Sequence, residues 1–383
     1  MAEALMPLSP LQSPGNAAMN EKRIALLDCF RGIAILLVVC FHYFSRWTPP
    51  RDEVNRYPYG DLLSTVPLFN YGYMGVELFF IISGFVIALT LLNTEHWPAF
   101  VARRFARLYP AMLLASLLTY ACKLAFPALQ LPFSATDLLP GLTFIQPEVW
   151  QAVFGHTVRS MDGPYWSLYV EVKFYLWTAV LYYAGGRERF LLHFTLFFTA
   201  VMSQIAVNKL IAVTWWMPMA RQVFTFDYLP WFALGVGFFF LRSNPRNRLA
   251  LVLTLEAVCV LLVIALRWRD SADLPFHFVF FALFAVLVFR EHWLQWLAWK
   301  PLASLGAASY SLYLLHLSIG LTLINLASSA LGLDGSAQSV WIAFAVLALM
   351  AALSLLVYRL WEIPARKWLM QVFDGYRTAR QRR

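Results

Sequence analysis

The sequence contains ten apolar segments of about the length that crosses a lipid bilayer. They lie at residues 24–45, 73–93, 108–126, 166–185, 190–208, 225–241, 249–267, 275–290, 306–328 and 339–361. A helix of about 20 mostly apolar residues spans roughly 30 Å of hydrocarbon. Only 13% of the residues are charged, whereas soluble domains carry about a quarter. We therefore predict an all-α polytopic membrane protein, a bundle of about ten transmembrane helices.

The distribution of Lys and Arg predicts the orientation of this bundle. Basic residues gather on one side, at 22–23, 103–107, 187–189, 242–248, 290, 300 and the C-terminus. The side richer in Lys and Arg faces the cytoplasm. Ten spans then place both termini in the cytoplasm, which indicates a multi-pass protein of the cell inner membrane. The net charge of +9 is no nucleic-acid signature, because the basic residues lie mainly between apolar segments.

The chain divides into a short N-terminal segment, one membrane domain and a tail. Residues 1–21 have no cleavable signal, and we expect them to be a disordered cytoplasmic N-terminus. Residues 22–366 hold the apolar segments, and residues 367–383 form a basic cytoplasmic tail. The cysteines (Cys29, Cys40, Cys122 and Cys259) all lie in apolar segments, so we expect neither structural disulfides nor a metal site.

The first apolar segment carries two residues that are costly in hydrocarbon, Arg31 and His42. Their spacing of eleven residues places both on nearly the same face of a helix, roughly 16 Å apart along it. Asp28 lies one turn before Arg31 and is placed to neutralise part of its charge. We interpret the pair as part of an internal polar site. The alternative is a snorkelling arginine beside a packed histidine.

Arginines also gather where the third apolar segment begins. Arg103, Arg104 and Arg107 follow i, i+1, i+4 spacing, so Arg104 and Arg107 share a helix face. Guanidinium groups bind phosphates through paired hydrogen bonds. We expect a phosphate-binding mouth here, and the alternative is an ordinary cytoplasmic anchor. Glu362, which closes the tenth segment on the same side, is placed to pair with Arg31 or another arginine.

The remaining polar residues lie toward the opposite side. Glu77 begins the second segment, where Ser83 and Gly84 suit close helix packing. Glu171 lies inside the fourth segment and shares a face with Tyr175, whereas Glu171 and Lys173 do not face each other. Ser309, Tyr313 and His316 form a polar stripe in the ninth segment. A lone histidine on such a stripe is more often a hydrogen-bonded core residue than a catalyst.

These stretches together resemble the acyltransferase 3 family of membrane enzymes. The marks are Arg31 and His42 with ten residues between them, GVELFFIISGF, RRFAR before Tyr109-Pro110, WSLYVE with Trp166 and Ser167, YSLYLLH, and Glu362-x-Pro364-x-Arg366. They span residues 22 to 366, so the resemblance covers the whole predicted membrane domain. Two features differ from many members: Val172 and Lys173 follow Glu171, and a C-terminal hydrolase-like domain is missing.

The resemblance implies ten helices and O-acyl transfer from acyl-CoA, most often acetyl-CoA, to a hydroxyl of an extracytoplasmic glycan or sugar. No permanently bound cofactor is expected. His42 would be the general base, and a covalent acyl-His42 is a less favoured variant. Arg31 would stabilise the donor, Arg103, Arg104 and Arg107 would hold CoA phosphates, and Glu171 and Glu362 would assist. The other expected polar site residues are Asp28, Glu77, Trp166, Ser167, Tyr313 and His316.

Two other classes of protein fit the same sequence. One is a proton-coupled transporter or flippase of a glycan precursor, which would move its substrate without consuming acyl-CoA. The chain has no internal repeat, and many transporters are built from repeated halves. The other is a non-catalytic membrane assembly subunit, which would tolerate replacement of Arg31 and His42. The oligomeric state cannot be read from the sequence.

Overall fold

The computed structural model describes residues 14–381, apart from positions 50, 54, 212–222, 226, 269 and 270. The described residues form helices and connecting turns, with no strand among them. The α-helices are α1 (Pro14–Phe44), α2 (Pro67–Asn70), α3 (Gly75–Leu92), α4 (Trp97–Ala125), α5 (Leu138–Thr143), α6 (Pro147–Phe154), α7 (Trp166–Tyr183), α8 (Phe190–Ile211), α10 (Leu229–Ser243), α11 (Arg248–Trp268), α12 (Leu274–Phe289), α13 (Lys300–Ala307), α14 (Ser309–Leu315), α15 (Ser318–Ala330), α16 (Val340–Val357) and α17 (Ile363–Gln381).

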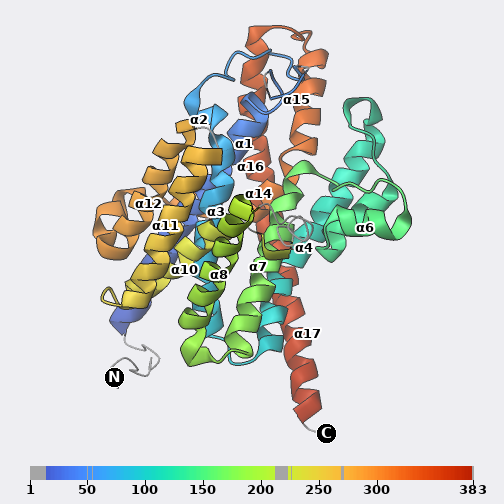
Figure 1. The fold of residues 1–383 in the computed structure, drawn as a ribbon. Helices are drawn as coiled ribbons and strands as arrows, with labels where there is room; N and C mark the ends of the chain where they lie inside the picture. Colours follow the sequence, from blue (N-terminus) through green and yellow to red (C-terminus); the bar gives the residue numbers. More distant parts are fainter. Residues whose placement is uncertain are drawn as a thin grey trace.

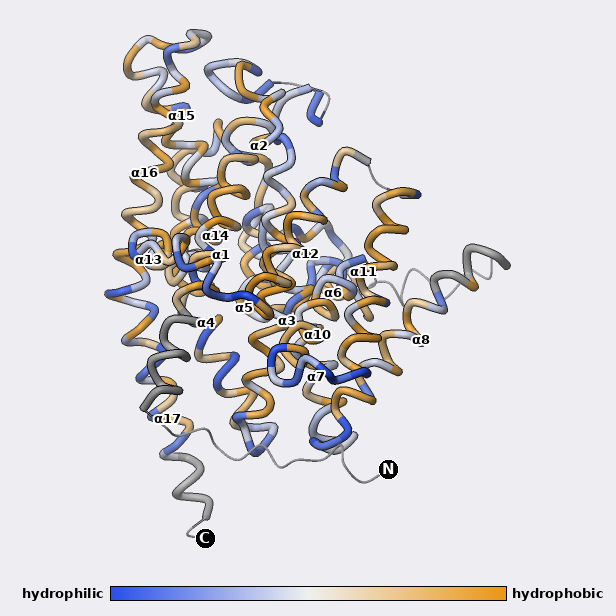
Figure 2. Tube along the Cα trace, turned by 90° about the vertical axis from the view of Figure 1, so that its left-hand side faces the viewer, coloured by the Kyte–Doolittle hydropathy of each residue, from blue (hydrophilic) through white to orange (hydrophobic). Residues whose placement is uncertain are grey.

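The helices form an elongated bundle in which α1 begins and α17 ends at the same end (Figure 1). That end also holds the start of α4 with its arginines, and we call it the arginine end. Apolar residues cover most of the helices, while hydrophilic residues gather in the connections between them (Figure 2). The segment that carries α5 and α6 projects from the side of the bundle (Figure 1).

Each predicted apolar segment coincides with helix, but ten membrane spans are not confirmed. Five stretches of the described chain are long and apolar enough to cross a membrane, at 25–44, 72–92, 97–125, 248–267 and 337–375. Counting each of two bent helix pairs as one span gives up to seven. Helix α7 carries Glu171 and Lys173, and α10 has only 15 residues. Helices α7, α8 and α10 are the three predicted spans outside this count.

Glycines bring the central helices α3 and α10 into close contact. A Cβ atom on Gly84 would lie 2.1 Å from the carbonyl oxygen of Phe232, and one on Gly235 would lie 2.1 Å from that of Ile81. Both distances are far below van der Waals contact, so only glycine permits this approach. The packing role predicted for Gly84 is confirmed, and the contact fixes the α3 face that carries Ser83.

Two interruptions of regular helix differ from the predicted pattern. The ninth segment was expected to be one span over 306–328, but α14 and α15 meet at a bend of 61°. His316 and Leu317 lie between the two helices, at the bend. In the last span, Tyr358–Glu362 forms a π-helical turn between α16 and α17. π-Bulges and broken membrane helices occur frequently at functional sites. His316 and Glu362, which lie at these two interruptions, are therefore candidate site residues.

The chain termini differ in part from the expected boundaries. Helix α1 begins at Pro14, so residues 14–21 of the segment expected to be disordered are helical. Residues 1–13 lie outside the described residues. The predicted tail is a continuation of helix, because α17 runs from Ile363 to Gln381. The arginine cluster is likewise helical, since α4 begins at Trp97, eleven residues before the predicted third span.

Candidate active site

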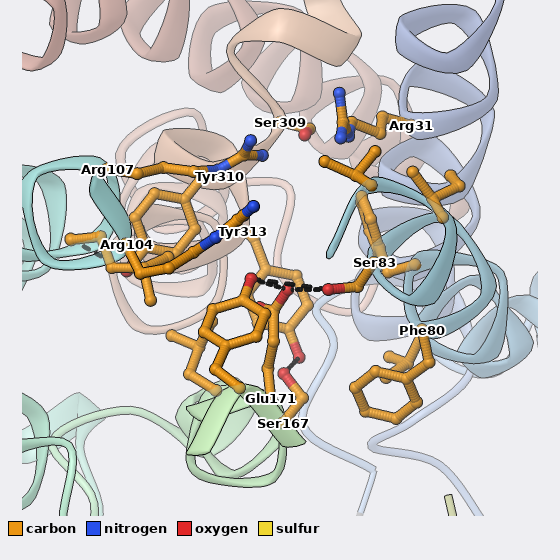
Figure 3. Close-up of a pocket in the computed structure, with 17 residues that line it drawn as sticks. Arg31, Phe80, Ser83, Arg104, Arg107, Ser167, Glu171, Ser309, Tyr310 and Tyr313 are labelled. Atoms are coloured by element: carbon orange, nitrogen blue, oxygen red, sulfur yellow. Dashed lines mark hydrogen bonds between the residues drawn. The ribbon is translucent and has the colours of Figure 1, made fainter. Parts of the chain in front are cut away.

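A cavity inside the bundle brings together residues from α1, α3, α4, α7 and α14 (Figure 3). Its volume is about 70 Å³. Its polar lining residues are Arg31, Ser83, Arg104, Arg107, Ser167, Glu171, Tyr175, Ser309, Tyr310 and Tyr313. Four of the seven arginines and glutamates expected at the site, Arg31, Arg104, Arg107 and Glu171, therefore line one cavity. The other three, Arg103, Glu77 and Glu362, lie outside its lining.

Three guanidinium groups reach this cavity from two helices. Arg104 and Arg107 are one turn apart on α4, and Arg31 approaches from α1 (Figure 3). Arg31 Nη1 lies 2.6 Å from Asp28 Oδ1, as the i,i+3 spacing predicts. The Arg104 guanidinium lies 5.0 Å from the centroid of the Tyr175 ring and donates to Thr90 Oγ1. Asp28, which pairs with Arg31, and Glu171 on α7 offset two of the three guanidinium charges. The cavity therefore keeps an excess of positive charge and favours an anionic group.

Glu171 links α7 to α3. Its Oε1 accepts hydrogen bonds from the Ser83 hydroxyl and from the Tyr175 hydroxyl (Figure 3). The shared face of Glu171 and Tyr175 is confirmed. The interpretation of Ser83 as a packing residue alone is wrong, because its hydroxyl holds the carboxylate in place. Lys173 points elsewhere and donates to Gln146, which confirms that Glu171 and Lys173 do not pair.

Arginines also surround a second hollow at the arginine end. It is lined by Thr90, Asn93, Arg103, Arg104, Arg107 and Arg366, together with apolar residues. Arg104 and Arg107 line both this hollow and the inner cavity, so the two spaces meet at these side chains. Arg103 differs from them, because it is exposed and donates to Asn93 O at 3.3 Å and to Thr94 Oγ1 at 3.1 Å. Arg366 comes from α17 and adds a fourth cation to this mouth.

His42 and His316 form a pair, which the sequence did not indicate. His42 Nδ1 lies 3.2 Å from His316 Nε2 and 2.9 Å from Val38 O. His316 Nδ1 lies 2.8 Å from Tyr313 O. Carbonyl oxygens only accept hydrogen bonds, so both Nδ1 atoms carry protons. The single proton of His42 Nδ1 is then shared between Val38 O and the more distant His316 Nε2, and His42 Nε2 keeps its lone pair. His316 is buried and hydrogen-bonded as expected, but it is not alone, because its ring faces His42.

The histidine pair lies next to the inner cavity rather than in its wall. Tyr313, three residues before His316, lines the cavity, and the Tyr313 and His316 rings are 5.9 Å apart. The Tyr313 hydroxyl lies 2.7 Å from Ser167 Oγ, which confirms that these two predicted site residues meet. The bend at His316 allows its ring to face α1. Backbone geometry at a helix break therefore places the second imidazole.

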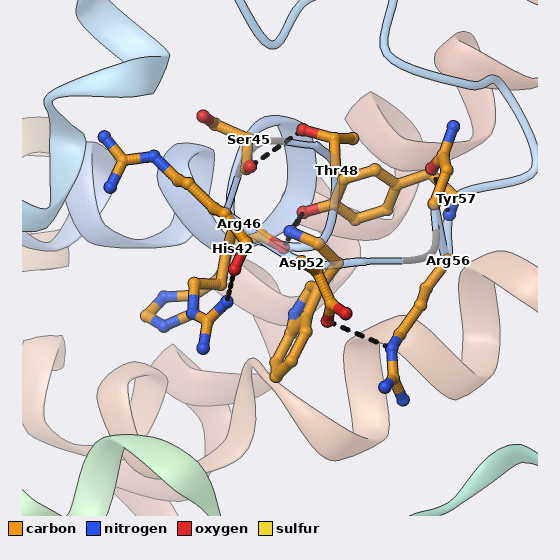
Figure 4. A network of polar contacts seen from close by, with 10 residues as sticks. His42, Ser45, Arg46, Thr48, Asp52, Arg56 and Tyr57 are labelled. Atoms are coloured by element: carbon orange, nitrogen blue, oxygen red, sulfur yellow. Dashed lines mark hydrogen bonds and ion pairs between the residues drawn. The ribbon is translucent and has the colours of Figure 1, made fainter.

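The loop after α1 fixes the end of the helix that carries His42 (Figure 4). The Tyr57 hydroxyl donates to the His42 carbonyl oxygen at 2.7 Å, and the backbone N–H of Trp47 donates to Tyr57 at 3.2 Å. Burial raises the pKa of Tyr57, so this hydroxyl stays protonated. Tyr43 donates to His316 O at 2.8 Å. These hydrogen bonds fix the backbone positions of both histidines.

Three other predicted site residues lie outside the cavity. Glu362 is buried and accepts from Ser311 Oγ at 2.8 Å. It forms no ion pair with Arg31 or any other arginine in the described ranges. Glu77 is buried in the first turn of α3, one residue from the lining Val76. Trp166 is 38% exposed and packs on Tyr228 at 5.0 Å.

Comparison with known proteins decides the family of this chain. A family model described as an acyltransferase domain, Acyl_transf_3, matches residues 24–359. The chain belongs to the acyltransferase 3 family. The predicted family resemblance is confirmed.

Relatives of this acyltransferase include proteins of different lengths. Peptidoglycan O-acetyltransferase OatA of Listeria monocytogenes is 23% identical over 94% of this chain and 58% of its own length. BcsY of Komagataeibacter xylinus, described as a membrane-bound transacylase, is 27% identical over 76% of this chain and 71% of its own. Regulator of hypoxia-inducible factor 1 of Caenorhabditis elegans is 32% identical over 24% of this chain and 21% of its own length. The chain thus spans less than two thirds of two of these relatives. No solved structure matches it.

Proposed function

We propose that this acyltransferase moves an acyl group, most simply acetyl, from acyl-CoA in the cytoplasm to a hydroxyl of a glycan or sugar on the other side of the inner membrane. The observation that carries the proposal is the position of the histidine pair beside a cavity with three guanidinium groups. A cationic cavity suits an anionic, phosphate-bearing donor, and an imidazole suits proton transfer from a hydroxyl near neutral pH.

The donor would enter from the arginine end. Arg103, Arg104, Arg107 and Arg366 line the mouth there, so the phosphates of CoA would bind at this point. Arg104 and Arg107 also line the inner cavity, into which the narrow pantetheine arm would extend. Arg31 and His42 are roughly 16 Å apart by helix rise, and a linear arm can cover that interval. Arg31 would stabilise the bound donor within the cavity, at a distance from the reacting carbonyl next to His42.

His42 would act as the general base. Its Nε2 lone pair would take the proton of the acceptor hydroxyl as the oxygen attacks the thioester carbon. The new C–O bond forms, the C–S bond breaks, and the proton passes from His42 to the departing CoA sulfur. The hydrogen bond from His42 Nδ1 to His316 Nε2 would stabilise the charged imidazole in this step.

Reconstitution tests this proposal. Purified full-length protein in proteoliposomes should release CoA thiol from acetyl-CoA on the side of the arginine end, and it should acetylate an acceptor glycan supplied on the other side. Mass spectrometry of the glycan would detect the added acetyl group. Transfer of the glycan across the membrane without release of CoA would contradict the proposal and favour a transporter.

A further inference from the structure

A second large hollow lies near the opposite end of α4 from the arginines. It is lined by residues of the loop after α1, the end of α4, the segments 128–137 and 159–163, and α15. We call it the Lys123 groove. Lys123 is 16 residues after Arg107 on α4, which corresponds to about 24 Å of helix. The groove has a volume of about 510 Å³, within the roughly 300–1,000 Å³ typical of small-ligand pockets.

Lys123 is a buried cation without a counter-ion in contact. Its side chain lines the groove and the residue is only 8% exposed. Its Nζ lies 5.8 Å from the Phe133 ring centroid. Within the described part of the chain it forms no hydrogen bond and no ion pair, although Asp162 attracts it at longer range. A buried ammonium group is costly unless an anion or several acceptors face it.

The two acids of the groove are already engaged by neighbouring hydrogen-bond donors. Asp162 accepts from the backbone N–H groups of Gly163 and Ser318, at 2.8 and 3.0 Å, and from the Ser318 hydroxyl. Asp137 accepts from the N–H groups of Ser134 and Arg159, at 2.9 and 2.8 Å. Both carboxylates therefore hold loops in place rather than serve Lys123. Three basic residues against these two acids leave the groove a formal charge of +1.

The other polar groups of the groove include both donors and acceptors. The Trp47 indole N–H is buried and has no acceptor among the described residues. Arg159 uses one guanidinium nitrogen on Pro132 O, at 3.2 Å, and the Arg56 guanidinium lies 3.3 Å from Asp52. The amide nitrogens of Gln130 and Asn325 already donate to Thr322 Oγ1 and Leu321 O, at 2.7 and 2.8 Å, so these side chains offer their oxygens. A ligand that complements this wall brings an anionic group for Lys123 and hydroxyl groups, which both donate and accept.

The groove also adjoins the histidine pair. Leu317, which directly follows His316, lines it, and so does Trp47, five residues after His42. The chain passes from Tyr313 in the inner cavity, through His316 at the bend, to Leu317 in the groove. The residues just before and just after this helix break therefore line different hollows.

We propose that the Lys123 groove binds the acceptor, and that the acceptor is an oligosaccharide carrying a carboxylate, such as a uronic acid unit. The carboxylate pairs with Lys123, and neighbouring sugar hydroxyls face the amides and the Trp47 side of the groove. The role of the bound sugar as the acceptor rests on the proposed acyl transfer, but its binding does not require catalysis. A single carboxylate matches the one ammonium group of the groove, and Arg56 is already paired with Asp52.

Equilibrium binding to the purified full-length protein tests this proposal. The probes are tetragalacturonate and its carboxyl-reduced, neutral form, measured by calorimetry without acetyl-CoA. The wild type should bind the acid at least about tenfold more tightly, which corresponds to one charge-assisted contact. Lys123→Met keeps the length of the side chain and should lose that preference. Lys123→Arg should retain most of it, and Lys300→Met, an exposed lysine outside the groove, should behave as wild type.

Equal affinity for the two probes, no binding of either probe, or a preference that survives in Lys123→Met would overturn the proposal. Thermal unfolding of Lys123→Met, compared with wild type, separates loss of binding from loss of fold. A protein that transfers acetyl groups yet does not distinguish the probes refutes only the groove. A protein that distinguishes the probes yet never consumes acetyl-CoA refutes only the proposed transfer.

Discussion

Replacing the arginines of α4 one at a time should separate those that bind the donor from one that does not. Arg104 and Arg107 line both the mouth and the inner cavity, whereas Arg103 lines only the mouth. Arg103 is exposed, and two acceptors of the α3–α4 connection already bind it. The three residues belong to one turn and a half of one helix, so they form a matched set.

The magnitude follows from the contacts that each side chain can offer a phosphate. A charge-assisted hydrogen bond in a partly buried site contributes about 1.5–3 kcal/mol, so Arg104→Ala or Arg107→Ala should weaken acetyl-CoA binding roughly 10- to 150-fold. Arg104→Lys should recover only part of this, since an ammonium group lacks the guanidinium fork. Arg103→Ala should change the affinity by less than about threefold, as is usual for exposed charges.

The assay is equilibrium binding of acetyl-CoA to detergent-purified variants, with the KM for acetyl-CoA measured in proteoliposomes. Thermal midpoints report whether each variant is folded. Arg104→Ala and Arg107→Ala that bind acetyl-CoA as tightly as wild type would refute the reasoning, and the cluster would then be a topological anchor. An effect of Arg103→Ala as large as that of Arg104→Ala would show that charge at the mouth matters, rather than placement in the cavity.

Three further variants test other parts of the site. Glu171→Gln removes the negative charge of the carboxylate that accepts from Ser83 and Tyr175, so kcat should fall at least about tenfold. The control Glu188→Gln, at an exposed position, should have no effect, and equal rates for Glu171→Gln and the wild type would contradict a role for the carboxylate. His316→Ala removes one of the two acceptors of His42 Nδ1 and leaves Val38 O. The kcat should fall roughly 10- to 100-fold, as for other residues that orient an imidazole, with the KM for acetyl-CoA unchanged; a change confined to KM would argue against it. Gly84→Ala should lower the thermal midpoint by the equivalent of about 1–3 kcal/mol or more, because the added Cβ would meet Phe232 O at 2.1 Å. In the control Gly375→Ala the added Cβ meets nothing within 4 Å, so the midpoint should not change.

Much of the helical architecture could be predicted from the sequence, because apolar length is a strong signal in a membrane protein. The extent of α4 was the least accurate, since Pro110 lies inside the helix rather than near its start. Pro110 has no N–H for the carbonyl four residues earlier, and such prolines are tolerated in membrane helices that pack against neighbours. Trp361 Nε1 donates to the carbonyl oxygen of Pro110 itself at 2.7 Å, so the last span packs against this turn. That partner is 251 residues away in sequence, so no local pattern could reveal it.

The charged residues of the candidate site could be predicted from the sequence, but the long-range contacts between its side chains could not. Arginines and glutamates stand out in apolar segments, and helix spacing correctly paired Asp28 with Arg31. The contact between His42 and His316 depends instead on a bend after Leu315, and the residues there, HLSIG, carry no proline to signal it. The role of Ser83 depends on its partner Glu171, 88 residues away. Long-range packing decided both.

The central claim is that His42 carries out proton transfer in acyl transfer, and His42→Ala tests it most directly. The variant should be expressed in the membrane and bind acetyl-CoA with wild-type affinity, because the donor site is formed by Arg104, Arg107 and Arg31. In proteoliposomes it should transfer no acetyl group to the acceptor glycan, as judged by mass spectrometry. Transfer by His42→Ala at a rate close to that of the wild type would contradict the account.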